Sequence, residues 1–263
     1  MRILSWDVGI YNLAYCLIEY SEKTKNCKIL DWNIINLRKD EDNATKQNII
    51  RCDGLNNKKI GKIIYPNTKK CNNKAKFIHK SSDKHYCLRH AKKHHKSISI
   101  DTACNKTFDT TFKLIKIKKP KKKKIKIHEL GKNLIVELLK YPEFLNIDYI
   151  LIENQPVLKN PTMKSVQMIL YSYFLINGLI KNTIKEIKFI SARNKLKIYD
   201  GPPIEVKVKG KYAKRKRLSI EHCRYMINDN ETNLQFFNEH KKKDDLADSY
   251  LQAKWFLKKS NFI

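Results

Sequence analysis

A single carboxylate near the end of an apolar run, within the first ten residues, constrains the fold most strongly. Most of residues 3–8 are apolar, which is typical of a buried central strand. Asp7 interrupts this run, and Gly9 follows where the chain must turn sharply. A charge inside a buried strand is costly unless it is paired or bound to a metal ion. From this segment alone, an Asp that caps the turn explains the residue as well as a functional carboxylate does.

The apolar runs that follow the first strand predict a mixed sheet. Residues 13–18 predict a β-hairpin with its bend at 10–12, and residues 27–37 predict a third strand, so these strands form an antiparallel meander. Apolar residues at helical spacing then predict a helix over 130–139, and residues 148–153 predict another strand. A crossover helix makes the strands that it connects parallel. We therefore expect an α/β fold with parallel strands added to the meander.

The charge of the chain indicates a polyanionic partner. The sequence has 55 basic and 26 acidic residues, which gives a formal net charge of +29. Of the basic residues, 47 are Lys and 8 are Arg, and an A/T-rich coding sequence also produces such a composition. Because the acidic residues are not enriched in parallel, we interpret the excess as favouring nucleic acid.

The sequence does not fit an exported or membrane-spanning protein. Asp7 falls where the apolar part of a signal peptide would begin, and the most apolar later stretch, 166–180, is too short to span a bilayer. The chain has seven Cys, an odd number, without an export signal. We therefore expect reduced thiols or metal ligands and no disulfide framework.

The segment 39–118 is polar and rich in Lys and Asn, and it predicts an insertion. We expect one domain made of residues 1–38 and 119–263, and a small zinc-ribbon-like module made of 39–118. A lysine run bounded by Pro, residues 116–124, overlaps the end of this module. Such runs are usually solvated, and they bind phosphate backbones without reading sequence.

Four residues of the insertion, Cys52, Cys71, Cys87 and His90, predict a zinc site. The close pair Cys87 and His90 has the spacing of one knuckle of a tetrahedral site, whereas the first two Cys are far apart in the sequence. Zinc suits this segment because a small lysine-rich module cannot bury enough apolar surface to fold alone. Unrelated reduced thiols are the alternative. Other residues of the insertion remain candidates as substitute ligands: Cys104, His79, His85, His94 and His95.

Further carboxylates occur in settings similar to that of Asp7. Glu153 ends an apolar strand, so it is expected beside Asp7 at the carboxyl edge of the sheet. Asp245 and Asp248 are i and i+3 at the start of a predicted helix and share one face. N-capping explains one of them but not the pair, and Asp244 is an alternative to Asp245 as a ligand. Adjacent carboxylates repel, so the group requires a proton or divalent cations.

Three stretches of sequence contain these carboxylates: SWDVGIYNLA around Asp7, ILIENQP around Glu153 and KKDDLADSYL around Asp245 and Asp248. Together they resemble the RuvC-type Holliday junction resolvases, in particular their poxvirus branch. The resemblance covers most of the chain outside the insertion, which the short poxvirus enzymes lack. It implies a ribonuclease H-like mixed sheet flanked by helices and a homodimer. It also implies Mg²⁺-dependent cleavage of four-way DNA junctions in viral recombination, replication and repair, in the cytoplasm of the host cell.

The resemblance further implies a basic catalytic residue before the last helix. Lys216 is selected here, with Lys214 beside it and Lys195 as a further candidate. Two Mg²⁺ ions roughly 4 Å apart bind the scissile phosphate in such a site. Asp7 is expected to bridge them, and the other carboxylates, Glu153, Asp245 and Asp248, are expected to complete the two coordination spheres. The Lys offsets charge in the transition state.

Other classes remain as alternatives at this point. One is another ribonuclease H-like nuclease that cleaves RNA–DNA hybrids or belongs to a transposon. A phosphotransferase of the sugar-kinase and actin type also opens with a strand and Asp-x-Gly, but it needs a second lobe and phosphate loop that this chain does not clearly contain. A non-enzymatic zinc protein that binds nucleic acid leaves the carboxylates unexplained.

Overall fold

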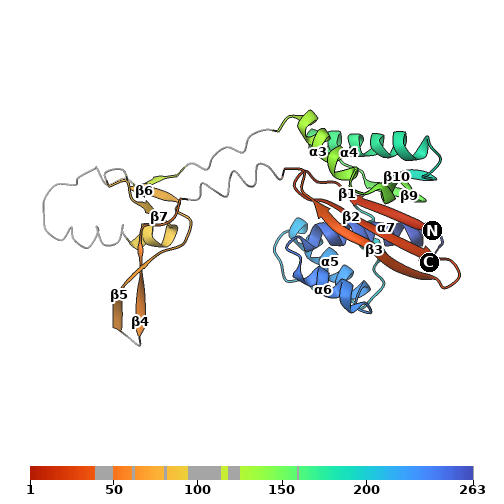
Figure 1. Cartoon of the computed structure of the whole chain (residues 1–263). Helices are drawn as coiled ribbons and strands as arrows, with labels where there is room; N and C mark the ends of the chain where they lie inside the picture. Colours follow the sequence, from red (N-terminus) through yellow and green to blue (C-terminus); the bar gives the residue numbers. More distant parts are fainter. Residues whose placement is uncertain are drawn as a thin grey trace, which may run out of the picture. The chain divides into compact units, whose positions relative to one another are not determined.

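The computed structural model describes residues 1–38, 50–60, 63–79, 82–93, 114–117, 125–158 and 160–262, without the side chains of 57–60 and 63–68. The chain divides into two compact units (Figure 1). The core unit consists of Met1–Lys39 and Ile125–Ile263, and the inserted unit consists of Asp40–Lys124. The inserted unit extends six residues beyond the end of the segment predicted from the sequence, which was 39–118.

The core unit is built on a five-stranded mixed sheet with the strand order β10-β9-β1-β2-β3. β1 pairs antiparallel with β2, β2 pairs antiparallel with β3, and β9 is parallel to both β1 and β10. The predicted meander and the predicted parallel neighbour of the first strand are both present. The strands span Arg2–Asp7 (β1), Leu13–Ser21 (β2), Asn26–Ile35 (β3), Tyr149–Glu153 (β9) and Glu186–Ile190 (β10).

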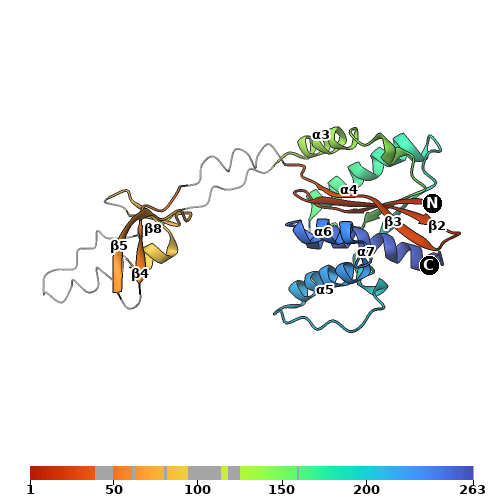
Figure 2. The same cartoon turned by 60° about the horizontal axis from the view of Figure 1, so that its bottom comes forward.

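Helices cover both faces of this sheet, with α3 and α4 on one face and α5, α6 and α7 on the other (Figure 2). The alternation of β1 matches this arrangement, because Leu4 and Trp6 pack with residues of α3 and α4, whereas Ile3 packs with residues of α7. No helix in the described part of the chain has the length and apolarity needed to cross a bilayer. The helical segments span Ile127–Leu138 (α3), Pro142–Leu145 (η1), Pro161–Phe174 (α4), Leu175–Leu179 (η2), Lys195–Ile198 (η3), Lys211–Met226 (α5), Glu231–Glu239 (α6) and Lys243–Lys259 (α7).

Two helical segments differ from the sequence-based expectation. Residues 163–184 predict a mostly buried helix, but the segment is α-helical only to Phe174 and ends in the π-helical turn η2. In this turn, Gly178 lies directly under the side chain of Ile184, so the chain folds back onto itself where a larger residue would clash. Helix α6 was not predicted because its sequence is largely polar, and Phe237 is its buried anchor.

The inserted unit contains little apolar core. A hairpin joins β4, Leu55–Ile60, to β5, Ile63–Lys70. A three-stranded sheet places β6, Phe77–His79, between β7, His85–Tyr86, and β8, Leu114–Lys116. A helical segment starts at Leu88. The buried apolar cluster of the inserted unit, within the described residues, is small and consists of Cys52, Cys71, Tyr86, Cys87 and Ala91.

Two buried side chains join helix α7 to the sheet. Gln252 Nε2 donates to Ser5 Oγ at 3.0 Å and to the carbonyl oxygen of Trp6 at 3.3 Å. Trp32 Nε1 donates to the carbonyl oxygen of Leu246 at 3.1 Å. These bonds fix the middle of α7 against the end of β1, where Asp7 lies, and the start of α7 against β3.

We predict that Gln252→Ala lowers the free energy of unfolding of the core unit by about 1–3 kcal/mol, because it removes buried hydrogen bonds. Urea denaturation of the purified protein measures this change. Gln235→Ala is the matched control, since Gln235 is exposed on α6 and its substitution should have an effect within about 0.5 kcal/mol. Equal stability of the two variants would show that the α7–β1 bonds do not hold the sheet edge in place.

Candidate active site and metal cluster

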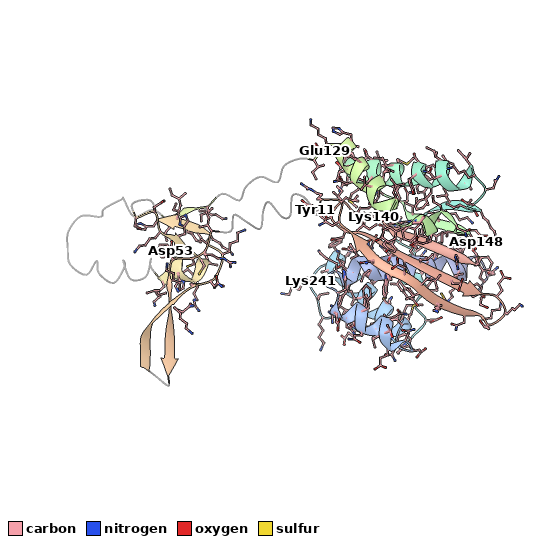
Figure 3. The ribbon with its side chains drawn as sticks, viewed as in Figure 1. Tyr11, Asp53, Glu129, Lys140, Asp148 and Lys241 are labelled. Carbon is pink, nitrogen blue, oxygen red and sulfur yellow. The ribbon has the colours of Figure 1, made fainter. Side chains whose placement is uncertain are left out.

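Two carboxylates lie at the same edge of the sheet because their strands are parallel and in register. Trp6 of β1 is aligned with Ile152 of β9, so Asp7 and Glu153, the last residues of these strands, are neighbours. Figure 3 shows this end of the sheet near Tyr11, which follows β1, and the opposite end near Asp148, which precedes β9. The juxtaposition predicted from the sequence is therefore present.

Helix α7 adds Asp245 and Asp248 to this group. The N-cap residue of α7 is Lys242, and its side chain makes no capping hydrogen bond. Neither Asp is the N-cap, so helix capping does not account for this pair. The side chains of both Asp residues line the cleft that also contains Asp7.

The ammonium group of Lys195 lies among three of these carboxylates. Its Nζ is 2.5 Å from Asp248 Oδ2, 3.2 Å from Glu153 Oε1 and 3.5 Å from Asp7 Oδ1. Lys195 is the first residue of η3, and its side chain is only 12% exposed. One buried cation therefore joins carboxylates that come from β1, β9 and α7.

Lys216, the basic residue selected from the sequence, occupies a different position. Its ammonium forms an ion pair with Asp244 and lies 5.3 Å from the centre of the Tyr212 ring. Lys216 lines the cleft but makes no ion pair with Asp7, Glu153 or Asp248 in the structure. The geometry therefore favours Lys195 over Lys216 as the basic residue of the site. In a chain with 47 Lys, sequence position alone does not show which ammonium is buried among carboxylates.

Other buried side chains orient the carboxylates. Gln155 Nε2 donates to Glu153 Oε2 at 2.8 Å, and the backbone N–H of Gln155 donates to Gln167 Oε1 at 2.8 Å. The hydroxyl of Ser219 on α5 donates to Asp248 Oδ1. These polar residues were not predicted from the sequence as part of the site.

Burial raises the pKa values of two site carboxylates, Asp7 and Asp248, although the nearby Lys195 acts to lower them. Burial raises the pKa of Asp7 well above its usual range, and the neighbouring Glu153 raises it further. Burial also raises the pKa of Asp248. For Lys195, burial alone would lower the pKa, but the attraction of Asp7, Asp248 and Glu153 outweighs it and raises the pKa.

Asp245 carries the clearest sign of unbalanced charge. Burial, followed by the nearby charges of Asp244 and Asp7, raises the pKa of Asp245 to about 7. Asp244 differs, because its ion pair with Lys216 outweighs the effect of burial and lowers its pKa. A nearby divalent cation favours the ionised form of a carboxyl whose pKa is raised in this way. Asp245 is therefore better suited than Asp244 to act as a metal ligand.

These groups lie in a cleft of about 800 Å³. The cleft also contains basic and aromatic side chains, among them Arg193, Arg215, Tyr11 and Tyr212. An acidic group within a partly basic cleft is suited to a phosphate chain whose reacting group is held by metal ions.

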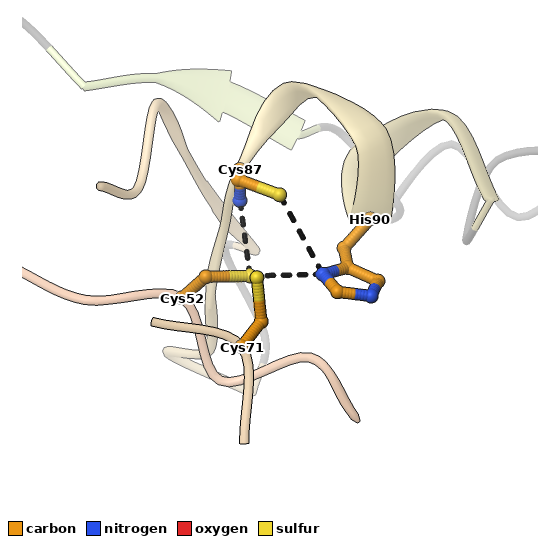
Figure 4. Close-up of side chains that lie close together, drawn as sticks. All are labelled: Cys52, Cys71, Cys87 and His90. Atoms are coloured by element: carbon orange, nitrogen blue, oxygen red, sulfur yellow. Dashed lines mark hydrogen bonds between the residues drawn. The ribbon is translucent and has the colours of Figure 1, made fainter. Parts of the chain in front are cut away.

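A second cluster lies in the inserted unit and consists of the four residues predicted as zinc ligands (Figure 4). The ligand atoms of Cys52, Cys71, Cys87 and His90 all lie within 4.8 Å of one another, and all four residues are buried. His90 Nδ1 is 3.3 Å from Cys52 Sγ and 3.5 Å from Cys87 Sγ. Atoms bound to one tetrahedral zinc ion are about 3.5 Å apart, so these separations fit that metal.

The surroundings of the cluster favour a thiolate at Cys87 and a neutral imidazole at His90, whereas burial raises the pKa of Cys52. Backbone N–H groups of Gly54 and Cys87 point at Cys52 Sγ, at 3.4 and 3.2 Å. Burial would raise the pKa of Cys87, but backbone hydrogen bonds and neighbouring side chains lower it overall. Burial lowers the pKa of His90. A Cβ on Gly54 would lie 2.5 Å from the His90 ring, so this glycine allows the chain to pass close to the ligand.

The substitute ligands named from the sequence are not part of this cluster where they are described. His79 Nδ1 bonds to the hydroxyl of Ser82 at 2.9 Å, and His85 lies beside Asp53. The remaining candidates and most of the lysine run lie outside the described residues: Cys104, His94, His95 and 118–124.

Comparison with known proteins places the chain among resolvases. The family model described as mitochondrial resolvase Ydc2 / RNA splicing MRS1 matches residues 3–157, and the poxvirus A22 protein model matches residues 97–259. The first match contains Asp7 and Glu153, and the second contains Glu153 and the residues of η3 and α7. Uncharacterized protein L451 of Acanthamoeba polyphaga mimivirus is 32% identical over 98% of this chain and 74% of its own length.

Similarity to solved structures is weaker. The Fowlpox virus resolvase in complex with Holliday junction DNA is 14% identical with a TM-score of 0.47, and 99% of each chain is covered. The yeast mitochondrial Holliday junction resolvase Ydc2 is 17% identical with a TM-score of 0.48, and 99% of this chain and 81% of that one are covered. Membership rests on the two family models and the viral relative, which together span nearly the whole sequence. The chain belongs to the family of poxvirus-type Holliday junction resolvases.

Proposed function

We propose that this protein is a Mg²⁺-dependent endonuclease that cleaves four-way DNA junctions. The observation that carries the proposal is the group of three carboxylates around buried Lys195, in a cleft that Arg193 and Arg215 also line. One matching family description names both a resolvase and an RNA-splicing protein. The carboxylates favour the nuclease, because a protein that only binds RNA gains nothing from concentrating negative charge where phosphates must lie.

The donor set of the cleft fits magnesium. It offers carboxylate oxygens, which Mg²⁺ prefers, and an open cleft leaves room for the waters that this ion retains. Asp7, Glu153, Asp245 and Asp248 are the residues that would hold the ions. Bound there, the ions would supply an activated water and stabilise the leaving oxygen of the scissile phosphate.

The protein's own groups complete the reaction. Lys195 Nζ is a buried charge beside the ligands, so it is placed to balance negative charge that develops on the phosphate. Gln155 and Ser219 hold Glu153 and Asp248 in fixed orientations. Less conformational entropy is therefore lost when these carboxylates bind a metal ion. Arg193 and Arg215 line the same cleft and hold the flanking phosphates.

The remaining parts of the proposal follow from this activity. Two incisions across a symmetric junction require two active sites, so we infer a homodimer. The mixed sheet with catalytic groups at the ends of neighbouring strands is consistent with the ribonuclease H-like class. The viral relative supports a role in viral DNA recombination, and we infer that the protein acts at a cytoplasmic replication site.

The proposed function is tested by incubating the protein with Mg²⁺ and a synthetic four-way junction, beside a linear duplex and an RNA–DNA hybrid. Paired, symmetric incisions in the junction are expected, with little cleavage of the duplex. Preferential cleavage of the hybrid would instead assign the chain to the ribonuclease H type of activity.

Asp7→Asn and Glu153→Gln should each abolish cleavage and retain junction binding. The substitutions are nearly isosteric, remove a metal ligand and relieve repulsion in the metal-free protein. Glu19→Gln is the control, because Glu19 is paired with Arg2 at the opposite end of the sheet. Gel shifts and single-turnover cleavage give both readouts, and near-normal cleavage by either active-site variant would refute the assignment.

Lys195→Met should reduce the cleavage rate about 10²-fold to 10³-fold, as loss of one well-placed charge donor does. Two controls show whether the loss depends on the buried position of Lys195 or only on the removal of one positive charge. Lys197→Met removes an exposed Lys from the same segment η3, and Lys216→Met removes the residue selected from the sequence. If Lys216→Met loses more activity than Lys195→Met, Lys216 is the catalytic cation.

We further propose that the cluster of Cys52, Cys71, Cys87 and His90 holds one structural zinc ion. Three thiolates and one imidazole form a closed tetrahedral set without a position for substrate, which is typical of structural zinc. The small apolar core of the inserted unit makes its folding dependent on this metal.

The purified protein should contain about one zinc per chain, and Cys87→Ser should lose it. Cys27→Ser is the control, because Cys27 lies in β3 of the core unit and outside the cluster. Elemental analysis under reducing conditions measures the metal. Zinc-free wild-type protein, or full occupancy in Cys87→Ser, contradicts the proposal.

A further inference from the structure

The positive charge of the chain is concentrated in the inserted unit. Residues 40–124 contain 24 basic and 7 acidic residues, a net charge of +17. The core unit, with more than twice as many residues, carries the remaining +12. Coding bias toward Lys acts on the whole gene alike, so it does not explain why the excess per residue is larger in the inserted unit.

The described basic side chains of this unit are available to solvent. Lys70, Lys74, Lys84 and Lys92 are all exposed, although they lie on different elements of the unit. Burial is described for only two acidic residues of the unit, Asp53 and Asp83. The exposed surface of the described part is therefore strongly positive, with few internal ion pairs to offset it.

Two basic residues, Arg51 and Lys74, stand at paired backbone positions, and the Arg51 guanidinium also donates to the carbonyl oxygen of Asn72 at 2.8 Å. Arg51 and Lys74 form an isolated antiparallel β-bridge, so their side chains leave the backbone on the same face. Both side chains are exposed. Like charges at opposed positions destabilise a β-pair, whereas a bridging anion such as a phosphate group stabilises them.

We propose that the inserted unit is a second DNA-binding surface, which contacts the phosphate backbone without reading sequence or branch geometry. Only the identity of the polyanion as DNA rests on the proposed function. The described part of the inserted unit differs from the cleft of the core unit. It combines a net positive charge with a closed Cys/His cluster, and its described residues contain no group of carboxylates. It therefore adds affinity and leaves the chemistry and the choice of branched DNA to the core unit.

The test compares two full-length variants that lose the same charge. The first replaces Lys70, Lys74, Lys84 and Lys92 with Gln in the inserted unit. The second replaces four exposed lysines of the core unit that do not line the cleft: Lys23, Lys28, Lys181 and Lys259. Affinities for a fluorescent four-way junction and a linear duplex are measured without Mg²⁺ at several salt concentrations. Zinc content and circular dichroism establish that each variant is folded.

The inserted-unit variant should bind both DNA forms about tenfold more weakly, with a salt dependence reduced by about 1 to 3 in log–log slope, since each phosphate contact contributes roughly 0.9. The core-unit variant should stay within about twofold of wild type. Equal losses in both variants, or loss of junction binding alone, would overturn the inference. Wild-type protein that binds DNA in this way but does not cleave junctions contradicts the proposed function and leaves this inference intact.

Discussion

Mutual repulsion among buried carboxylates is the constraint on which the rest of the core unit depends. Asp7, Glu153 and Asp248 are held together by a parallel strand pair and by a helix fixed across the sheet, and Lys195 balances only part of their charge. Holding these groups close therefore lowers the stability of the fold, and a purely structural site would not need such a cluster of like charges. Divalent cations would relieve this repulsion, and in the proposed reaction the same cations and Lys195 would compensate the further negative charge of the scissile phosphate.

Much of this architecture was predictable because the relevant signals are local. Apolar runs ending in Asp7 and Glu153 predicted neighbouring strands, and the i, i+3 spacing of Asp245 and Asp248 predicted a shared helical face. The position of Lys195 was not predictable in this way, because it depends on how η3 folds back over the sheet edge after β10. The same is true of Gln155 and Ser219, whose roles exist only through contacts across elements.

The two units solve different stability problems. The core unit buries two continuous apolar layers against its sheet, so it tolerates a charged cleft at one end. Within its described residues, the inserted unit has a small core in which Tyr86 and Ala91 pack with the three Cys of the cluster. The four residues of the cluster were predicted as one group from the sequence, because the close pair Cys87 and His90 has the spacing of a metal-binding knuckle. A metal-stabilised fold can carry a surface rich in positive charge, since its stability does not depend on burying much of that surface.

Diffraction from crystals grown with Mn²⁺ tests the central claim most directly, because Mn²⁺ prefers the same oxygen ligands as Mg²⁺ and gives an anomalous signal. Anomalous peaks are expected within coordination distance of Asp7, with Glu153 and Asp248 or Asp245 completing the ligand sets. Lys195 is also expected to move away from at least one of the three carboxylates that it contacts in the metal-free protein. A cleft without peaks at millimolar Mn²⁺, with Lys195 still in contact with all three, would contradict the assignment of these carboxylates as metal ligands.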